Sequence, residues 1–131
     1  MERVFLDANV FISAALKPTS GIASLWALPG VRLVCSPYVL EEARRNVPTG
    51  EVAERLEHLI GSLSILPAEP ADFALVDDPG LPSKDRPVLL AAIVSRADVL
   101  LTGDLTHFGG CMDRTVGGVR VLLPARYLGG R

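Results

Sequence analysis

Short apolar runs alternate along the chain with segments whose apolar residues recur at helical spacing. Each short run is bounded by polar or turn-forming residues, which is typical of a buried strand. We therefore predict strands at residues 4–6, 31–35, 64–67, 99–101 and 119–123. The helical spacing predicts helices at residues 9–16, 22–28, 36–47, 51–63, 86–97 and 124–128.

Local signals support two of these helices and two loops. Ser36 stands where a helix N-cap is expected and Pro37 at the first helical position. The helix at residues 86–97 is apolar nearly all round, so we expect it to be deeply buried. Residues 68–85 and 107–118 are rich in Gly, Pro and Asp, which favours loops. The alternation of strand and helix predicts an α/β fold with a parallel sheet covered on both faces.

The composition is that of a small folded domain, and it does not point to a strongly charged binding partner. The 131 residues suit one domain, and 49% apolar with 21% charged residues excludes a disordered chain. A mean hydropathy of +0.34 points to apolar surface that a partner or a second copy would cover. Two cysteines form no zinc pattern, and the opening residues match neither a signal peptide nor a membrane span. We expect a cytoplasmic protein.

Acidic residues follow two of the predicted strands at the point where each strand ends. Asp7 comes directly after the strand at 4–6, and Asp104 follows the strand at 99–101, after Thr102 and Gly103. Ligands of open α/β sheets bind at the carboxyl ends of the strands, so two carboxylates are expected to meet there. We expect Gly103 to let the backbone turn so that Asp104 faces the site.

Two further acids belong to helices that begin at the same edge. Glu41 and Glu42 follow the strand at 31–35, and the rotation of about 100° per residue in a helix separates them. Glu42 borders the apolar stripe and can lie over the sheet edge, whereas Glu41 faces solvent. Asp85 stands just before the buried helix, whose start should lie at this edge too.

Four carboxylates in one place repel each other unless a cation neutralises them. Oxygen ligands of this kind suit Mg²⁺ or Mn²⁺, and such sites cleave phosphodiester bonds. Each acid also has an ordinary explanation: Asp7 and Asp85 as helix caps, Glu42 as a solvated helix residue and Asp104 as a turn residue. The convergence of four separate placements favours the shared site.

Four segments of the chain resemble the motifs of PIN-domain nucleases. The segments VFLDANVFISA and SPYVLEEARR resemble the first two motifs. The segment LPSKDRPVLLAAIVSRADVLLTGDLTHFG resembles the third and fourth, and VGGVRVLLPARYL resembles the usual last strand and helix. The resemblance covers nearly the whole chain, so we expect one PIN domain over residues 1–131. It is strongest to small prokaryotic PIN proteins of the kind that act as toxins of toxin–antitoxin pairs.

The resemblance implies a Rossmann-like three-layer α/β/α sandwich with a mainly parallel central sheet, and metal-dependent ribonuclease activity. It assigns the metal-holding and catalytic acids to Asp7, Glu42, Asp85 and Asp104. By the same resemblance, Asn9 positions the first acid or a metal-bound water. Thr102 would form a hydrogen bond near the phosphate.

Three basic or titratable residues stand near the acids in the sequence. Lys84 and Arg86 flank Asp85, and they either contact phosphate groups or are solvated residues at the helix start. His107 either contacts phosphate or donates a proton, or it packs within its turn.

We expect a Mg²⁺- or Mn²⁺-dependent endoribonuclease that cleaves RNA, with a possible antitoxin partner and a homodimeric state. The alternative is a PIN-fold interaction or RNA-binding module with little or no catalysis. A dinucleotide dehydrogenase is disfavoured because no G-x-G-x-x-G follows a strand. An aspartyl phosphatase is disfavoured because its second acid would stand where Asn9 is.

Overall fold

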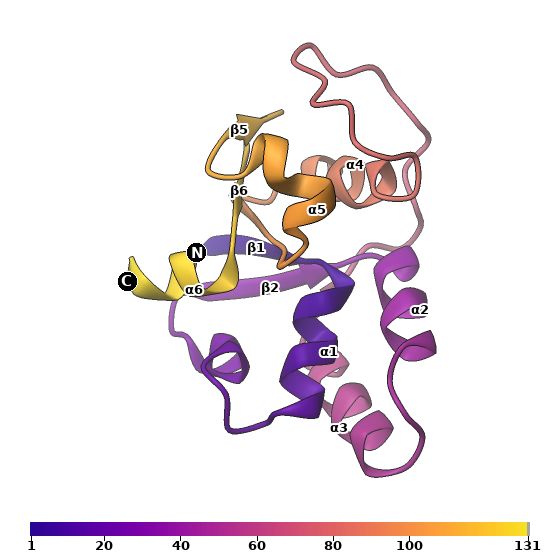
Figure 1. Ribbon diagram of the computed structural model, residues 1–131, viewed down its shortest axis with the longest axis vertical. Coiled ribbons are helices and arrows are strands. Elements are labelled where there is room, and N and C mark those ends of the chain that lie inside the picture. The colour runs from indigo at the N-terminus through magenta and orange to yellow at the C-terminus, as the bar shows by residue number, and fades with distance from the viewer. Residues whose placement is uncertain (131) are drawn as a thin grey trace.

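A six-stranded sheet runs through the molecule in the computed structural model, which describes residues 1–130 (Figure 1). The strand order is β3-β2-β1-β4-β6-β5, and every neighbouring pair is parallel except the antiparallel pair of β5 and β6. The strands are β1 (Glu2–Leu6), β2 (Val31–Cys35), β3 (Ser64–Ile65), β4 (Val99–Leu101), β5 (Thr115–Val116) and β6 (Val119–Leu122).

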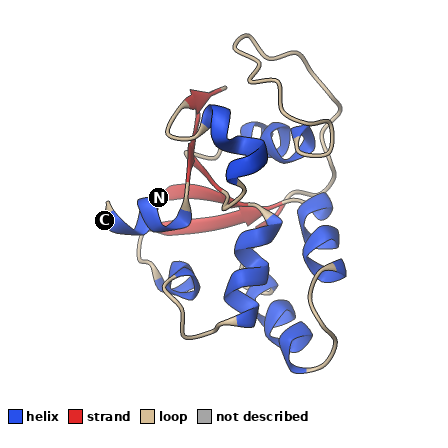
Figure 2. Ribbon diagram, viewed as in Figure 1, coloured by secondary structure: helices blue, strands red, loops and turns tan. Residues whose placement is uncertain are grey.

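Helices lie on both faces of this sheet (Figure 2). The α-helices are α1 (Ala8–Leu16), α2 (Pro37–Arg45), α3 (Glu51–Ile60), α4 (Arg86–Val94), α5 (Leu105–Phe108) and α6 (Pro124–Gly129). Two 3₁₀ helices, η1 (Ile22–Ala27) and η2 (Gly109–Cys111), complete the set. Helices α1 and α3 pack together on one face and α4 covers the other (Figure 1). This arrangement confirms the predicted α/β sandwich with a mainly parallel sheet.

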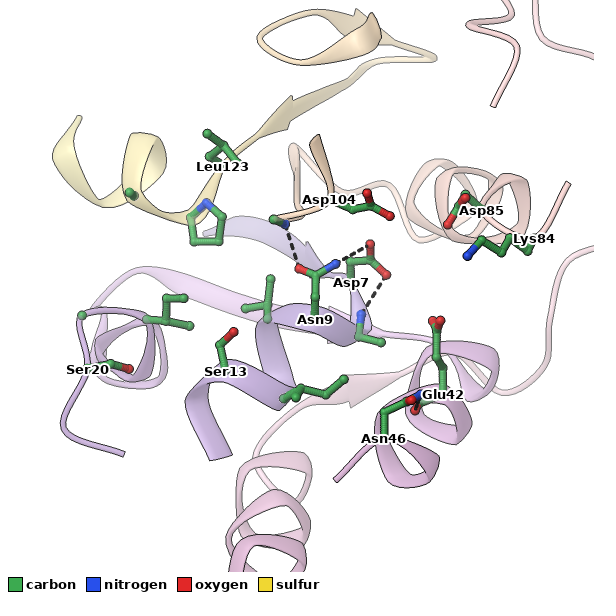
Figure 3. Close-up of a pocket in the computed structure, with 18 residues that line it drawn as sticks. Asp7, Asn9, Ser13, Ser20, Glu42, Asn46, Lys84, Asp85, Asp104 and Leu123 are labelled. Atoms are coloured by element: carbon green, nitrogen blue, oxygen red, sulfur yellow. Dashed lines mark hydrogen bonds between the residues drawn. The ribbon is translucent and has the colours of Figure 1, made fainter. Parts of the chain in front are cut away.

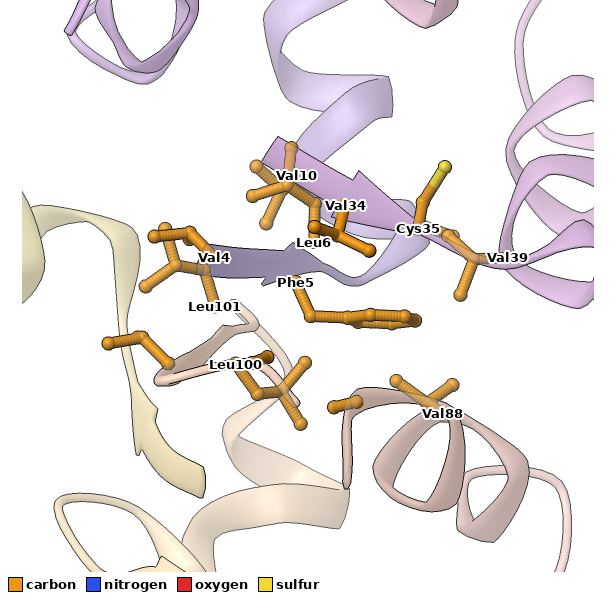
Figure 4. Close-up of a cluster of buried hydrophobic side chains, with 14 of the residues drawn as sticks. Val4, Phe5, Leu6, Val10, Val34, Cys35, Val39, Val88, Leu100 and Leu101 are labelled. Carbon is orange, nitrogen blue, oxygen red and sulfur yellow. The ribbon is translucent and has the colours of Figure 1, made fainter. Parts of the chain in front are cut away.

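The buried side chains alternate between the two faces of the central strands. Phe5 of β1 points toward Val88 of α4, whereas Val10 of α1 lies on the opposite side of the strand (Figure 4). Five consecutive residues of α4, 88–92, are buried, as the apolar composition of this helix predicted. Trp26 packs its ring edge-on against Phe11, with centroids 5.7 Å apart. Within residues 1–130, no helix is long and apolar enough to cross a membrane.

The segment predicted as a loop at residues 107–118 contains more structure than expected. It holds the end of α5, then η2 and β5, which forms a hairpin with β6. The two residues of the hairpin turn, Gly117 and Gly118, both have positive φ (57° and 83°), which such two-residue turns require. The pair Gly-Gly between Val116 and Val119 was the sequence signal for this hairpin.

Three predicted helices end two or three residues earlier than expected. Helix α2 ends at Arg45, α3 at Ile60 and α4 at Val94, although residues 95–97 continue the spacing of α4. Arg96 has a φ of 57°, and its amide donates to the Ile93 carbonyl, so the backbone turns out of the helix there.

The order of the strands fixes where a ligand site can form. From β1 the chain moves to β2 and β3 on one side, and later to β4 and β6 on the other. The parallel pair of β1 and β4 is therefore the switch point, where the loops diverge and leave a crevice at the carboxyl edge. Leu6 pairs with Leu101, which places Asp7 opposite Thr102 at that edge.

Candidate active site

A cavity of about 860 Å³ opens at this switch point (Figure 3). Four carboxylates from distant parts of the sequence line it. Asp7 comes from the end of β1, Glu42 from α2, Asp85 from the residue before α4, and Asp104 from the residue before α5. The structure thus brings together all four acids that the sequence analysis singled out.

Asp7 is the most constrained of the four. Its side chain is almost wholly buried, with 4% of the residue exposed. One oxygen, Oδ1, accepts a hydrogen bond of 2.8 Å from the amide of Ala8. The other, Oδ2, accepts from the Thr102 hydroxyl at 2.8 Å and from Asn9 Nδ2 at 3.1 Å. Asp7 is therefore the N-cap of α1, and its side chain lines the cavity in a fixed orientation.

Burial and neighbouring charges make the ionised form of Asp7 unfavourable. Burial is the largest effect, and the carboxylates of Glu42 and Asp85 add to it, so the pKa of Asp7 rises from 3.8 to about 6. The hydrogen bonds from Thr102 and Ala8 oppose this rise. Burial also raises the pKa of Asp85, with the charge of Asp104 adding to it and His107 and Lys84 opposing it. The cavity thus concentrates negative charge that the basic residues beside it neutralise only in part.

Asn9 links the two strands that carry the first and last acids. Besides its bond to Asp7, its Oδ1 accepts from the Gly103 amide at 2.7 Å. A Cβ at Gly103 would lie 3.3 Å from this oxygen, which is tighter than ordinary contact. The expected reason for Gly103 was a backbone turn, but its φ is not in the left-handed region and the close approach to Asn9 is the reason instead.

The Thr102 hydroxyl forms hydrogen bonds with Asp7 and Asp104 and does not face the cavity. Thr102 is fully buried, its hydroxyl donates to Asp7, and the same oxygen accepts from the Asp104 amide at 3.1 Å. The expectation of a hydrogen bond near a phosphate does not fit this placement, because Thr102 does not line the cavity.

The sequence geometry separated Glu42 from Glu41 correctly. Glu42 faces the cavity, while Glu41 is exposed and lies 3.8 Å from Arg45. Lys84 also lines the cavity. The Tyr38 hydroxyl, which the sequence analysis did not consider, donates to the Lys84 carbonyl at 2.5 Å and so ties α2 to the segment before α4. No local sequence pattern marks this contact, which spans 46 residues.

Arg86 lies elsewhere. Its guanidinium pairs with Asp72 at 2.7 Å and with Asp78 at 2.8 Å, and it donates to the Phe73 carbonyl at 2.6 Å. These contacts hold the long loop between β3 and α4. Arg86 does not line the cavity, so the expected phosphate contact finds no support.

His107 lies beside two of the acids without lining the cavity. Its Nδ1 is 3.0 Å from Asp85 Oδ2 and 2.8 Å from Asp104 Oδ2. The amide of His107 also donates to Asp104 Oδ1 at 3.1 Å, so Asp104 caps the short helix α5. An aspartate three residues before the histidine was the sequence signal for this cap.

Residues 3–106 match the protein family described as PIN domain, a match over most of the chain. The chain belongs to the PIN-domain family. No curated protein sequence matched it.

Solved structures share this PIN fold at low sequence identity. VapBC2 from Rickettsia felis, bound to a DNA fragment from its promoter, is 15% identical with a TM-score of 0.60, over 91% of this chain and 96% of the other. VapBC-1 from nontypeable Haemophilus influenzae is 18% identical with a TM-score of 0.60, over 94% and 98%. VapC20 from Mycobacterium tuberculosis, a sarcin-ricin loop cleaving toxin, is 15% identical with a TM-score of 0.53, over 79% and 92%.

The PIN site of this chain has the donor set for a divalent cation. Asp85 Oδ2 is buried and has no hydrogen-bond partner among residues 1–130, and Asp85, Asp104 and His107 each offer a ligand atom within 4.8 Å of the others. Burial makes the ionised form of the Asp7 carboxylate unfavourable, because it raises the pKa of this group. A cation bound here would coordinate Asp85 Oδ2 and offset the repulsion between the acids.

Proposed function

We propose that this PIN protein is an endoribonuclease that depends on Mg²⁺ or Mn²⁺. The observation that carries the proposal is the convergence of Asp7, Glu42, Asp85 and Asp104 on one cavity at the switch point of the sheet. Oxygen ligands of this kind suit both ions. The cleavage of RNA by VapC20, which shares the fold, supports RNA as the substrate.

In this proposal the chain supplies a fixed set of ligands and a docking point for phosphate. Asp7, Asp85 and Asp104 would hold the ion, and a bound ion supplies Lewis acidity that activates water and stabilises charge on a phosphate. The three hydrogen bonds on Asp7 fix its carboxylate before any ligand arrives. Lys84 would meet a phosphate oxygen of the substrate as a point charge.

Glu42 has one of two roles in this proposal. Its backbone carbonyl accepts from Asn46 Nδ2 at 2.7 Å, while its carboxylate points toward the cavity (Figure 3). We assign it as a fourth ligand or as the group that orients the attacking water by accepting a hydrogen bond from it.

The test compares single amide substitutions in an RNA cleavage assay with Mn²⁺. Asp7→Asn and Asp104→Asn should abolish cleavage, and Glu42→Gln should reduce it by about a hundredfold or more. Glu41→Gln is the matched control, because Glu41 is the adjacent acid and faces solvent. Cleavage that survived Asp7→Asn or Asp104→Asn would contradict the assignment. A wild-type protein that bound no Mn²⁺ at millimolar concentration would instead favour the interaction module.

We further propose that the protein is the toxin of a toxin–antitoxin pair. Two of the similar structures are VapBC complexes, which contain an antitoxin partner. The proposal expects a neighbouring reading frame that encodes a small DNA-binding protein, and growth arrest on expression that this neighbour relieves. Expression without arrest, together with no such neighbour, would contradict the toxin role. The homodimer stays a prediction, which sedimentation analysis can test.

A further inference from the structure

Three potential ligand atoms form a tight group beside the cavity, which Asp85 and Asp104 line and His107 does not. His107 Nδ1 lies 3.0 Å from Asp85 Oδ2 and 2.8 Å from Asp104 Oδ2. The three residues come from two separate segments, the start of α4 and the helix α5. Such a group is either an ion pair between a protonated imidazole and two acids, or a set of ligands.

The geometry of these contacts is poor for hydrogen bonding. His107 Nδ1 and Asp85 Oδ2 are both buried, and neither has a hydrogen-bond partner among residues 1–130 despite their short separation. A ring nitrogen donates or accepts along one direction only, so short separations without a hydrogen bond mean that neither carboxylate oxygen lies along it. Buried polar atoms that lack a hydrogen bond are unfavourable, so the arrangement favours a cation between them over the ion pair alone.

The spacing is that of neighbouring ligands around one ion. Two ligand atoms at right angles, each about 2.1 Å from a cation, are about 3.0 Å apart. The two nitrogen–oxygen distances at His107 are close to that value. Asp104 is oriented for this role because its other oxygen accepts from the His107 amide at 3.1 Å, which turns Oδ2 toward the ring.

We propose that His107 Nδ1 is a ligand of the catalytic divalent ion, beside Asp85 and Asp104. The inference rests on the metal dependence proposed above. An imidazole nitrogen binds Mn²⁺ and later first-row ions better than it binds Mg²⁺, which prefers oxygen. His107 therefore gives this site a preference for Mn²⁺ that a site built from carboxylates alone would lack.

Pulsed electron paramagnetic resonance of the Mn²⁺-loaded protein tests the ligand directly. A coordinated imidazole nitrogen modulates the electron spin echo, and labelling the histidines with ¹⁵N shifts the modulation frequency. The chain has two histidines, and His58 is exposed on α3. His58→Ala leaves His107 as the only histidine, so this variant should keep the nitrogen signal of the wild type.

A second measurement exchanges the donor atom and reads binding alone. In His107→Asn an amide oxygen can take the place of Nδ1, so a nitrogen ligand becomes an oxygen ligand. Calorimetric titration should show that the preference for Mn²⁺ over Mg²⁺ falls by about tenfold or more, while Mg²⁺ still binds. The nitrogen modulation should disappear in this variant.

Two results would overturn the inference. They differ in whether the proposed ribonuclease function is overturned as well. Mn²⁺ that binds to His58→Ala without nitrogen modulation would make His107 an ion-pair partner of the acids and leave the proposed ribonuclease intact. Failure of the wild type to bind Mn²⁺ would remove both proposals. The signals of the wild type and of His58→Ala do not depend on whether His107→Asn folds.

Discussion

Replacing Asp7 with asparagine should change how the stability of the metal-free protein depends on pH. The pKa of Asp7 rises from 3.8 to about 6 on folding, chiefly because the side chain is buried. A folded-state pKa above the unfolded value stabilises the protein only while the group is protonated. The contribution is therefore present below pH 3.8 and is lost as the pH rises through 6. A shift of about two pKa units corresponds to roughly 3 kcal/mol of unfolding free energy.

The substitution also changes hydrogen bonds, and this part does not vary with pH. Asp7 Oδ1 accepts from Ala8, and Oδ2 accepts from Thr102 and Asn9. Asparagine offers only one carbonyl oxygen. Either the Ala8 donor or the pair of donors from Thr102 and Asn9 therefore loses its acceptor, which lowers the unfolding free energy by about 2 kcal/mol. The variant should be less stable than the wild type at pH 4. Its stability should match or exceed that of the wild type at pH 8, where the wild type no longer gains stability from a protonated Asp7.

Urea unfolding in EDTA, repeated from pH 4 to pH 8, measures this crossover. The quantity to follow is the difference in unfolding free energy between wild type and Asp7→Asn, which should swing by about 2–3 kcal/mol over that range. Glu41→Gln, at an exposed acid, should show only a small difference and serves as the control. A difference for Asp7→Asn that stayed constant with pH would refute the argument that burial disfavours its charge.

Three further predictions concern the surroundings of the acids. Thr102→Val removes the donor to Asp7 Oδ2, so the pKa of Asp7 should rise further and Mn²⁺ affinity measured by calorimetry at pH 7 should fall about tenfold; unchanged affinity would show that Thr102 does not tune Asp7. Gly103→Ala should lengthen the contact to Asn9 Oδ1 and lower the unfolding free energy by about 1 kcal/mol, whereas Gly109→Ala, where a Cβ meets nothing within 4 Å, serves as its control. Arg86→Gln breaks both ion pairs to the loop, so limited proteolysis within residues 67–84 should become faster while RNA cleavage persists; equal proteolysis rates would mean that the loop is held by other contacts.

The placement of the acids was predictable because it follows from element boundaries and helical phase. Asp7 and Asp104 follow strands whose apolar runs are unambiguous, and parallel strands bring their ends to one edge. The rotation per residue in α2 was enough to choose Glu42 over Glu41. These inferences needed only local patterns and one rule of topology.

The contacts of the supporting residues were not predictable, because they depend on packing between distant segments. Arg86 is paired by a loop whose path has no periodic signal, and Tyr38 reaches a backbone carbonyl 46 residues away. His107 was assigned to a loop because α5 is only four residues long. The Asp104 cap would have revealed this turn, and with it the position of the imidazole beside Asp104.

The hydrogen bond between Thr102 and Asp7 joins residues that are 95 positions apart in the sequence. Ribosomes add about 5–20 residues per second in bacteria and eukaryotes, so roughly 5–20 s separate the synthesis of these two residues. Throughout that interval β1 has no β4 beside it, and Asp7 lacks both the hydroxyl that holds it and the Asp104 carboxylate that completes the cavity. A nascent chain therefore carries the first acid without an assembled site, and the site can form only when translation of the domain is nearly finished.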